Sequence, residues 1–487
     1  MLKKQTVVLL LILAIVGSSA LTLFVSKDHS FATSPGAGIL ASGGSNGLKQ
    51  EEAKKLGTAL DLIEGNYYQD VDRTKLVDGA INGMMQSLED PYSSYMGKQT
   101  AKEFEESIEG SFSGIGAEVS SDNGNVMVVS PIKGSPAEKA GIRAKDIILS
   151  VNGQSLQGLE LNEAVAKIRG PKGSEAKVSV KRTGTASPIE FVIVRDDVDL
   201  ETVKAHMEPG KIGVIEITQF SLNTGERFKS ELTKLEQQDM KGLVIDVRNN
   251  PGGVLSVVID IADQFVPQGK VIVQVEDKDK KRDKNVSKGK GKSYPVTLLM
   301  NKGSASASEI LAGALQQSAG AKLMGENSFG KGTVQTSFEK QLGDGSLLKI
   351  TIAKWLTPNG SWIHKKGIKP DIAVSQPDYF SVAPINKKVS LQYNTNNSDV
   401  KNAQIMLDGL GFKPGRKDGF FDQKTTTAVK EFQSSEKLKV TGIIDAKTAE
   451  SLESALIKAI RDPKRDNQMK SGIEEVRKEI AASASNK

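Results

Sequence analysis

The chain of 487 residues contains no cysteine. This absence excludes a catalytic thiol, a zinc site built on thiolates and any disulfide framework. Histidine is almost as scarce, because the whole chain has only three, His29, His206 and His364. Hydrophobic residues make up 38% of the chain and charged residues 25%, which indicates folded domains with packed cores. At about 100–200 residues per domain, the length predicts three or four folding units.

Long stretches without charge are also rare, and the clearest one lies at the N-terminus. Val7–Val25 is a run of 19 residues with no charged side chain, preceded by two lysines. A run of this length can span a bilayer, and the lysines favour a cytoplasmic N-terminus. Residues 1–26 are therefore predicted to be a membrane anchor or, alternatively, a cleaved signal peptide. In either case the body of the protein is extracytoplasmic, anchored or secreted, behind a flexible linker at residues 27–47.

Positive charge is in modest excess. The formal net charge is +6, and Glu276–Lys292 alone holds eight Lys or Arg against four Asp or Glu. This segment is interpreted as a solvated loop or hairpin tip, and attraction to anionic envelope polymers or lipid headgroups is the second interpretation. No nucleic-acid-binding motif accompanies the charge, so nucleic acid is not expected as a partner.

Three regions differ in their periodicity. Lys49–Gln99 has apolar residues at helical spacing, which predicts a pair of helices with one apolar stripe. This stripe packs on its own protein or forms a dimer contact. Ser113–Asp196 has short β-like runs separated by Gly, Pro and Asn. From Lys211 to about Ser375 strands and helices alternate, which predicts βαβ units around a largely parallel sheet.

The last two regions contain the clearest secondary-structure signals. The expected strands are Val126–Val129, Ile147–Val151, Lys177–Arg182, Ile189–Val194, Ile212–Ile217, Gly242–Val247 and Val296–Met300. The expected helices are Leu161–Ile168, Gly225–Gln237, Val257–Phe265 and Glu309–Ser318. Gly320 is expected to end the last of these helices.

The sequence VTLLMNKGSASASEILAGALQQSAG at Val296–Gly320 predicts a strand, a tight turn and a helix. The turn holds three serines, Ser304, Ser306 and Ser308. Unpaired backbone N–H groups and the helix dipole favour developing negative charge there. A serine nucleophile in this turn would have the amide of Ala307 as an oxyanion donor. The simpler interpretation is helix capping, which Ser308 with Glu309 is expected to provide.

A serine nucleophile needs a base, and the sequence offers two candidates. His29 lies beside the membrane segment and His206 lies in a stretch that joins two domains, which leaves His364. Lysine is the alternative, although a free lysine is protonated at neutral pH because its pKa is about 10.4. Burial lowers the pKa of a lysine far enough to make it a competent base. Lys331 in FGKGTV has such a setting, with glycines for close backbone approach and apolar neighbours.

Gly325–Lys331 also matches most of a phosphate-binding loop, G-x-x-x-x-G-K. The match fails at the next position, where Gly332 stands in place of the Ser or Thr that would hold magnesium. Nucleotides are not expected in an exported domain. A nucleotide site is therefore rejected, and no metal or cofactor is expected.

Three motifs together resemble the signature set of the carboxy-terminal processing peptidases, a family of Ser–Lys serine proteases. They are NKGSASASEI, GENSFGKGTVQ and the earlier DVRNNPGG at Asp246–Gly253. The resemblance implies that Ser306 is the nucleophile, that Lys331 is the base and that Gln335 positions the lysine. Gln335 lies four residues after Lys331, so the two face the same side of an extended segment.

The same resemblance bears on the rest of the core. It implies oxyanion donors at Ala307 and in the glycine pair of NNPGG, where Gly253, or else Gly252, is the candidate. It places His364 in a structural turn, TPNGSWIHKKGIKPDI. It covers about Lys49–Ser375 and implies an α/β fold, with a crotonase/ClpP-like protease core that carries an inserted, mainly β PDZ domain.

The segment Ser113-Gly114-Ile115-Gly116-Ala117 is similar to the carboxylate-binding loop of PDZ domains, and SPAEKAGIRAKDIILSVNGQSL follows it as a typical PDZ run. Such a glycine-rich turn aims successive backbone N–H groups at a terminal carboxylate, and the peptide then adds as a strand. The residues expected to bind a peptide C-terminus are Ser113, Gly114, Ile115 and Gly116. Arg169, just past the PDZ helix, is interpreted as an interdomain contact that reports peptide binding, or else as a solvated arginine.

The C-terminal region forms a separate small module. Asp399–Leu452 has two short helical patterns with Gly/Asp turns and resembles the helical peptidoglycan-binding domain. The alternative is a three-helix interaction module without affinity for glycan. Asp418–Asp422 lacks the ligand count and the closing Glu of a calcium loop.

The resemblance implies an extracytoplasmic serine endopeptidase that recognises exposed, apolar protein C-termini and acts in regulated processing of envelope or sporulation proteins. The opposing interpretation is a non-catalytic envelope scaffold that binds C-termini and cell wall. Expected partners also include peptidoglycan, the membrane and a second copy in a homodimer. The predicted domains after the linker are a helical region at 48–103, PDZ at 104–197, the protease core at 198–378, a linker at 379–396, the peptidoglycan-binding-like module at 397–456 and a polar helical tail at 457–487.

Overall fold

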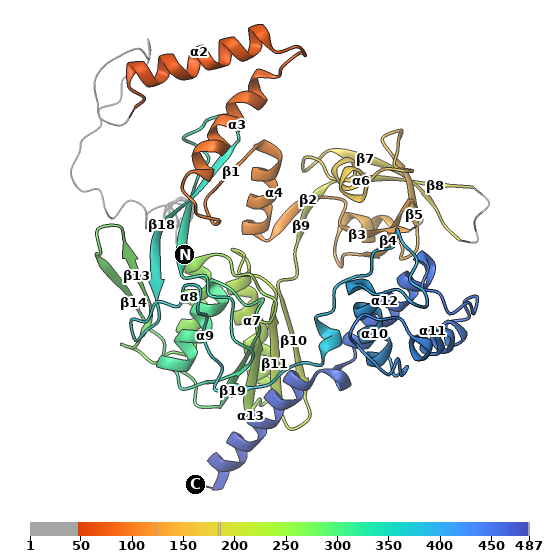
Figure 1. Cartoon of the computed structure of the whole chain (residues 1–487). Coiled ribbons are helices and arrows are strands. Elements are labelled where there is room, and N and C mark those ends of the chain that lie inside the picture. The colour runs from red at the N-terminus through yellow and green to blue at the C-terminus, as the bar shows by residue number, and fades with distance from the viewer. Residues whose placement is uncertain (1–46, 123, 184, 186, 486–487) are drawn as a thin grey trace. The chain divides into compact units, whose positions relative to one another are not determined.

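The computed structural model describes residues 47–122, 124–183, 185 and 187–485 (Figure 1). The run at Val7–Val25 lies outside these residues, so the anchor stays a prediction. Among the described residues, no helix combines the length and the apolar character needed to cross a bilayer. The chain forms two compact units. One comprises the described residues up to Ala101 with Gln335–Thr351, and the other comprises Lys102–Val334 with the described residues from Ile352 onward.

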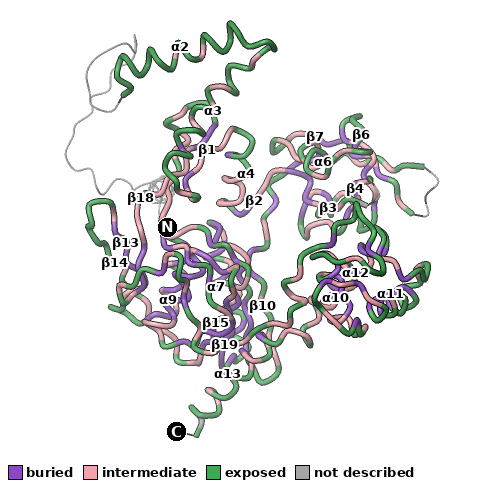
Figure 2. Tube along the Cα trace, viewed as in Figure 1, coloured by how far each residue is buried: buried purple, intermediate pink, exposed green. Residues whose placement is uncertain are grey.

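The first unit is built from helices and a short β-pairing. Its elements are α2 (Gln50–Asn66), α3 (Arg73–Gln86), β1 (Ser94–Met96), most of β17 (Thr333–Phe338) and the start of β18 (Leu347–Leu356). Asp72 is the N-cap of α3, because its side chain accepts the N–H of Thr74 at 2.9 Å. β1 pairs antiparallel with β18, with Ser94 opposite Lys349. No residue of α2 is buried, and the helix is mostly exposed and green in Figure 2.

The first domain of the second unit is a small β-domain. Its elements are α4 (Lys98–Glu109), β2 (Ser111–Gly114), β3 (Ala117–Asp122), β4 (Asn125–Pro131), α5 (Pro136–Ala140), β5 (Ile147–Val151), β6 (Gln154–Ser155), α6 (Leu161–Ile168), β7 (Glu175–Lys181), β8 (Ile189–Val194) and β9 (Asp196–Asp199). Strands β3-β4-β5-β7-β8 form an antiparallel sheet in that order. Its core includes Ile115, Val128 and Leu156, all fully buried. The chain enters on β2 and leaves on β9, and these strands pair with each other.

The second domain of this unit is an α/β core. Its elements are β10 (Val203–Glu208), β11 (Ile212–Ile217), α7 (Thr224–Gln237), β12 (Gly242–Asp246), α8 (Leu255–Asp263), β13 (Val271–Asp277), β14 (Arg282–Val286), β15 (Val296–Met300), α9 (Ala307–Ser318), β16 (Lys322–Gly325) and β19 (Ile372–Ala373). The sheet has the order β10-β11-β12-β15-β16-β19, and every pairing except β10–β11 is parallel. The predicted α/β fold is therefore confirmed.

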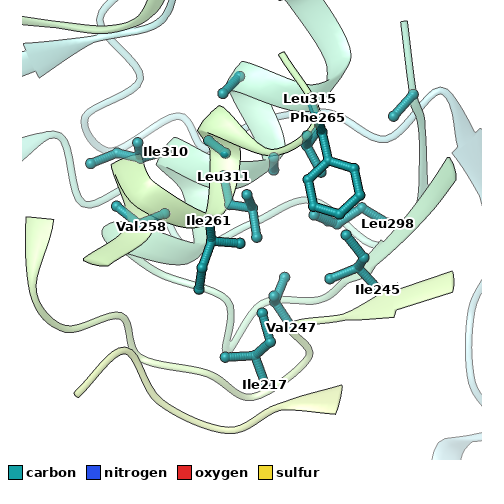
Figure 3. Close-up of a cluster of buried hydrophobic side chains, with 14 of the residues drawn as sticks. Ile217, Ile245, Val247, Val258, Ile261, Phe265, Leu298, Ile310, Leu311 and Leu315 are labelled. Carbon is teal, nitrogen blue, oxygen red and sulfur yellow. The ribbon is translucent and has the colours of Figure 1, made fainter. Parts of the chain in front are cut away.

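The two faces of this sheet bury different partners, because side chains alternate along a strand. Ile245 and Leu298 face α8 and α9, where they pack with Ile261 and Leu311 (Figure 3). The alternate residues Val244 and Leu299 face the opposite side. Both faces are covered by helices, as expected for a mainly parallel sheet.

The C-terminal region supplies the helix on the opposite face. Its elements are η1 (Asp378–Phe380), α10 (Ser398–Gly409), α11 (Gln423–Ser435), α12 (Ala446–Ile460), η2 (Pro463–Arg465) and α13 (Asn467–Ser485). Val476 of α13 is fully buried against Val244 and Leu299. A Cβ on Gly242 would meet Val476 at 2.3 Å, so glycine permits this approach. The segment predicted to be a polar helical tail therefore contributes a buried side chain to the core.

Helices α10–α12 form a module with its own core, built on a repeated device. Gln404 is buried, accepts the N–H of Gly419 (3.0 Å) and donates to Thr425 (3.0 Å). Gln433 repeats this pattern, since it accepts the N–H of Gly442 at 2.9 Å and donates to Thr448 at 3.1 Å. Each glutamine therefore fixes the Gly/Asp turn before the next helix.

Candidate active site

The three serines lie in the turn before α9 and the first residues of that helix, at residues 301–308, here called the serine turn. Ser304 and Ser308 are buried, and their hydroxyls donate to the carbonyl oxygens of Val247 (2.8 Å) and Asn250 (2.9 Å). Ser306 is half-buried and has a φ of +54°. A non-glycine residue at positive φ is uncommon and is often found at functional turns. Ser306 is therefore the one accessible serine of the three.

The start of α9 differs from the expectation in one respect. The N-cap is Ser306 rather than Ser308. Ser308 cannot cap the helix because its hydroxyl is bound to the carbonyl oxygen of Asn250. Glu309 accepts the backbone N–H of Ser306 through Oε2 at 2.8 Å, so the carboxylate holds the serine backbone in its unusual conformation.

The loop after β12, residues 247–253, is here called the glycine loop and lies against the serine turn. The N–H of Ala305 donates to the carbonyl oxygen of Asn250 at 3.0 Å. Oδ1 of Asn250 accepts the N–H of Gly252 at 2.9 Å. A Cβ on Gly252 would come within 2.9 Å of the Ser306 Cβ and 3.0 Å of the Ala307 nitrogen. Only glycine allows the loop to approach the serine this closely.

Two backbone N–H groups remain available, one next to Ser306 in the chain and one at the end of the glycine loop. Within the part of the chain that the structure describes, the amides of Ala307 and Gly253 have no hydrogen-bond partner. Ala307 is the first residue of α9, where the amide is unpaired by geometry and the helix dipole is positive. Gly253 is exposed, whereas the amide of Gly252 is occupied by Asn250. The geometry therefore favours Gly253 over Gly252 as a donor to a developing oxyanion.

Glu309 connects the serine turn to residues 328–332, here called the lysine segment. The carboxylate is fully buried and accepts four hydrogen bonds. Oε1 accepts the hydroxyl of Ser328 (2.6 Å) and the N–H of Gly330 (2.7 Å). Oε2 accepts the N–H groups of both Ser306 and Lys331, each at 2.8 Å. These two nitrogens are therefore no further apart than twice 2.8 Å.

This arrangement also explains why the partial phosphate-loop match has no meaning here. In a phosphate-binding loop the backbone N–H groups before and at the lysine point at the ligand. Here the N–H groups of Gly330 and Lys331 point at Glu309. The N–H groups that would bind a phosphate are therefore bound to the carboxylate of Glu309.

Two tryptophans hold the lysine segment from its other side. The indole N–H of Trp355 donates to the carbonyl oxygen of Lys331 at 2.8 Å, and that of Trp362 donates to Gly332 at 2.9 Å. A Cβ on Gly332 would lie 2.8 Å from the Trp362 nitrogen, and one on Gly330 would lie 2.9 Å from the N–H of Gly367. The close approach expected of these glycines is confirmed. Lys331 itself is half-buried.

His364 lies next to the same segment. Its Nδ1 accepts the N–H of Gly332 at 3.4 Å, and its ring stacks on Trp362 with centroids 5.1 Å apart. The turn-rich stretch that contains His364 is thus brought to the site. Both candidate bases named from the sequence therefore lie on or against the lysine segment.

Gln335 belongs to the first unit, where its side-chain amide donates to the Thr351 hydroxyl at 3.1 Å. Its expected role as the residue that positions Lys331 stays a prediction.

The predicted carboxylate-binding loop lies where β2 enters the small β-domain. Ile115 is fully buried and Gly116 has a φ of +77°. A Cβ on Gly116 would lie 2.4 Å from that of Ser135, so the turn requires glycine. Ser113 donates its hydroxyl to Asp197 at 2.7 Å, which fixes the loop to β9. A Cβ added to Gly114 would lie 3.7 Å from the side chain of Arg169.

Arg169 packs beside this loop and contacts a neighbouring element. Its guanidinium lies 4.8 Å from the ring centre of Phe112, and its Nη1 donates to Glu106 of α4 at 2.6 Å. The ion pair is partly exposed, with 36% of Arg169 and 14% of Glu106 accessible. Arg169 is therefore placed between the carboxylate-binding loop and the helix that precedes it.

Family models match four segments of the chain. They are peptidase family S41 at residues 211–374, a PDZ domain at 127–182, a peptidoglycan binding domain at 396–452 and the N-terminal domain of activating protease CtpB at 16–100. Among solved structures, the photosystem II D1 C-terminal processing protease is 28% identical and matches 67% of this chain and 94% of its own, with a TM-score of 0.40.

Two curated relatives from Bacillus subtilis (strain 168) are similar over nearly the whole chain. The carboxy-terminal processing protease CtpB is 47% identical over 442 residues, which are 90% of this chain and 92% of that protein. The carboxy-terminal processing protease CtpA is 43% identical over 473 residues, which are 97% of this chain and 98% of that protein.

The role of Glu309 gives the first testable prediction. In Glu309→Gln, the amide NH₂ would replace one of two oxygens that each accept at least one buried backbone N–H, leaving a buried donor without an acceptor and facing another donor. Each buried unsatisfied donor costs about 1–3 kcal/mol, so the free energy of unfolding should fall by about 2 kcal/mol or more. Chemical denaturation measures this change. The matched control is Glu326→Gln, a half-buried neighbour whose side chain makes no such contacts, and equal stability of the two variants would contradict the prediction.

Proposed function

The chain belongs to peptidase family S41 and is a serine peptidase of the carboxy-terminal processing type, and from this premise we propose that it cleaves exported proteins with a Ser306–Lys331 dyad. The observation that carries the proposal is the shared oxygen of Glu309. It brings the backbone nitrogens of Ser306 and Lys331 within twice 2.8 Å of each other. A lysine side chain is long enough to reach a serine hydroxyl across that separation.

In the proposed mechanism, Oγ of Ser306 attacks the scissile carbonyl carbon and its proton passes to Nζ of Lys331. The carbonyl oxygen becomes an oxyanion that the amides of Ala307 and Gly253 stabilise. Lys331 then gives the proton to the leaving amine, and an acyl-enzyme remains on Ser306. Water, deprotonated by Lys331, releases the second product and restores the serine. Gln335 is proposed to orient Lys331 during these transfers.

His364 is the competing base. Its Nδ1 is engaged with the N–H of Gly332, although the 3.4 Å separation makes this bond weak. A role in holding the lysine segment accounts for its position. We therefore assign His364 to the turn and Lys331 to proton transfer.

Substrate choice is proposed to begin at the PDZ domain. The loop Ser113–Gly116 binds the terminal carboxylate, and an apolar C-terminal peptide adds as a strand. The contact of Arg169 with Glu106 supports a role in reporting that binding to the rest of the protein. Release of the ion pair on peptide binding would be the signal.

The chain is further proposed to work at the cell envelope, in regulated processing that includes sporulation proteins. The helical C-terminal module would bind peptidoglycan, and the segment at residues 1–26 would hold the protein at the membrane or direct its secretion. A non-catalytic scaffold built on the same modules remains the competing function and is tested together with the dyad.

Homodimer formation is proposed through α2. Leu56 and Ile63 are 44% and 41% exposed on this helix, although with Leu60 they have the i, i+4, i+7 spacing of a packed stripe. An apolar stripe of this size is expected to be covered by another surface. A second copy of α2 would supply one.

The dyad is tested by cleavage of an unstructured protein with an apolar C-terminus by the full chain. Ser306→Ala and Lys331→Ala should each lower kcat by about 10⁴-fold or more, because nucleophile and base act as a unit. Ser304→Ala and Ser308→Ala should lose far less activity, because their hydroxyls hold the glycine loop and take no part in proton transfer. His364→Ala should also stay active. Loss of activity in His364→Ala with an active Lys331→Ala would make histidine the base, and an inactive wild type would favour the scaffold.

Recognition of the C-terminus is tested with the same substrate carrying a C-terminal amide. The amide removes the negative charge that the loop Ser113–Gly116 is proposed to bind, so the peptide should bind about tenfold more weakly, in line with a charge-assisted hydrogen bond. Isothermal titration with the Ser306→Ala variant measures binding without cleavage. Equal affinity for acid and amide would contradict the assignment of the loop.

The dimer is tested by light scattering of the full chain. Ile63→Glu places a charge in the apolar stripe and should convert a dimer to a monomer, because burying an unpaired charge is costly. Asp61→Lys, two residues away on the opposite face of the helix, is the matched control and should remain a dimer. A monomeric wild type would rule the dimer out.

A further inference from the structure

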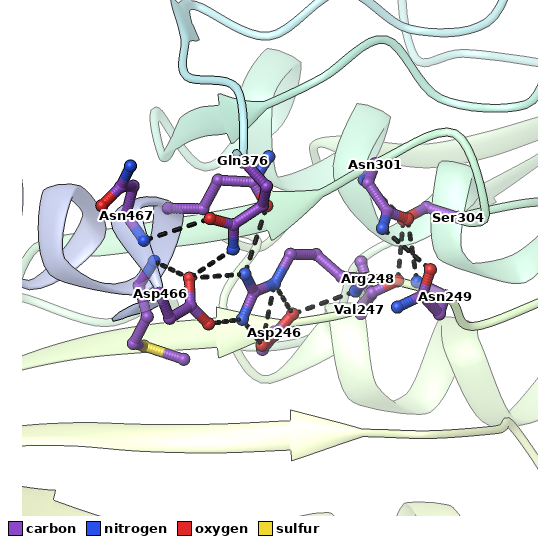
Figure 4. Close-up of polar contacts among 11 residues, drawn as sticks. Asp246, Val247, Arg248, Asn249, Asn301, Ser304, Gln376, Asp466 and Asn467 are labelled. Atoms are coloured by element: carbon purple, nitrogen blue, oxygen red, sulfur yellow. Dashed lines mark hydrogen bonds and ion pairs between the residues drawn. The ribbon is translucent and has the colours of Figure 1, made fainter. Parts of the chain in front are cut away.

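Arg248, the second residue of the glycine loop, lies between two carboxylates (Figure 4). Its Nε donates to Oδ1 of Asp246 at 2.9 Å and its Nη2 donates to Oδ2 at 2.6 Å. On the other side, Nη1 and Nη2 donate to Oδ1 and Oδ2 of Asp466 at 2.9 and 2.8 Å. The guanidinium thus makes paired contacts with a carboxylate at the end of β12 and with one 218 residues away in the sequence.

This cluster is shielded from solvent. The side chains of Arg248, Asp246 and Asp466 are 12%, 9% and 18% exposed. Burial alone would lower the pKa of Arg248, but its bonds to the two carboxylates outweigh burial and raise it. Burial would likewise raise the pKa of Asp466, and the bond to Arg248 reverses this and lowers it. The ion pair therefore stays charged, and removing one partner leaves an uncompensated buried charge.

Asp466 is itself rigidly held at the start of α13. Its Oδ1 accepts the N–H of Met469 at 2.9 Å and the side-chain amide of Gln376 at 2.6 Å. Gln376 also accepts the N–H of Asn467 at 3.1 Å (Figure 4). The helix that follows is fixed on the sheet by buried Val476. Asp466 is thus a fixed point outside residues 211–374, the segment that matches the peptidase family.

The chain next to Arg248 makes the contacts that join the glycine loop to the serine turn. Its own N–H donates to Asp246 at 3.0 Å. The next residue, Asn249, exchanges two hydrogen bonds with Asn301, both at 2.9 Å. Gly253 follows five positions after Arg248, at the end of the same loop. A change in how Arg248 is held would therefore shift the loop relative to Ser306.

We propose that Asp466 and Arg248 are positioning residues for catalysis, which hold the glycine loop so that the amide of Gly253 faces the oxyanion. The inference rests on the proposed function, because it requires Ser306 and Gly253 to act as assigned. It makes Asp466, the residue before α13, a necessary support of the proposed active site. A misplacement of about 1 Å in an oxyanion donor is enough to cost up to about 100-fold in rate.

The test compares Asp466→Asn with the wild type in the full chain. Asparagine keeps the shape but removes the charge that holds Arg248, so kcat should fall by about 10- to 100-fold with KM unchanged. A peptide aldehyde forms a tetrahedral adduct with the serine and needs the same donor. Its inhibition constant should rise by the same factor as kcat falls, because both report stabilisation of the oxyanion.

The matched control is Asp462→Asn, four residues earlier, whose carboxylate only accepts the N–H of Lys464. This variant should keep the wild-type kcat and inhibition constant. An Asp466→Asn variant that unfolds more easily, yet keeps both values, would reduce the ion pair to a structural role and overturn the inference. An inactive wild type would contradict the proposed function instead, so the two failures are distinguishable.

If Asp466→Asn does not fold, a milder variant tests the same inference. Gln376→Ala removes the hydrogen bond from the neutral amide to Asp466 and the one that Gln376 accepts from Asn467, and it leaves all three charges in place. It should lower kcat by about threefold, which corresponds to part of one hydrogen bond, and weaken the aldehyde equally. Unchanged kcat and inhibition constant in this folded variant would overturn the inference.

Discussion

The geometry of this site depends on one buried carboxylate. Glu309 has no access to water, and its two oxygens are satisfied by three backbone N–H groups and one hydroxyl. Such a group is costly to bury unless each lone pair finds a donor. Meeting that requirement forces the backbones of Ser306 and Lys331 onto the same oxygen. The hydrogen bonds that make it possible to bury this carboxylate therefore also fix the backbone positions of the proposed nucleophile and base.

The other contacts of the site extend from this one. The hydroxyls of Ser304 and Ser308 hold the glycine loop against the serine turn, and Trp355 holds the carbonyl group of Lys331 from the opposite side. The glycine loop is in turn held through Arg248 by Asp466, which lies outside the residues that match the peptidase family. Each element of the site is therefore fixed from two directions. This is the rigidity expected where a donor must meet charge that exists only in the transition state.

Much of this could be predicted from the sequence because the signals were local. All strands and helices expected between Val126 and Ser318 are present, with bounds within two residues, since apolar runs and glycine turns decide them. Glu309 was expected only as part of a helix cap, because its other partners lie 19 to 22 residues away and only the folded chain brings them together. Asp466 is 218 residues from its partner. The buried stripe of α13 was hidden among polar residues, and no local pattern indicated which surface it would cover.

The most direct test of the Glu309 arrangement is hydrogen exchange, measured by mass spectrometry, in the wild type and in Glu309→Gln. Peptides that cover the lysine segment are compared with a peptide from β12 as an internal reference. If the carboxylate holds these backbones, the amides of Gly330 and Lys331 should exchange at least about tenfold faster in the variant, while β12 is unchanged. Equal exchange of the lysine segment in both proteins would mean that Glu309 does not hold the backbone of the proposed base in place, and would contradict this account of the site.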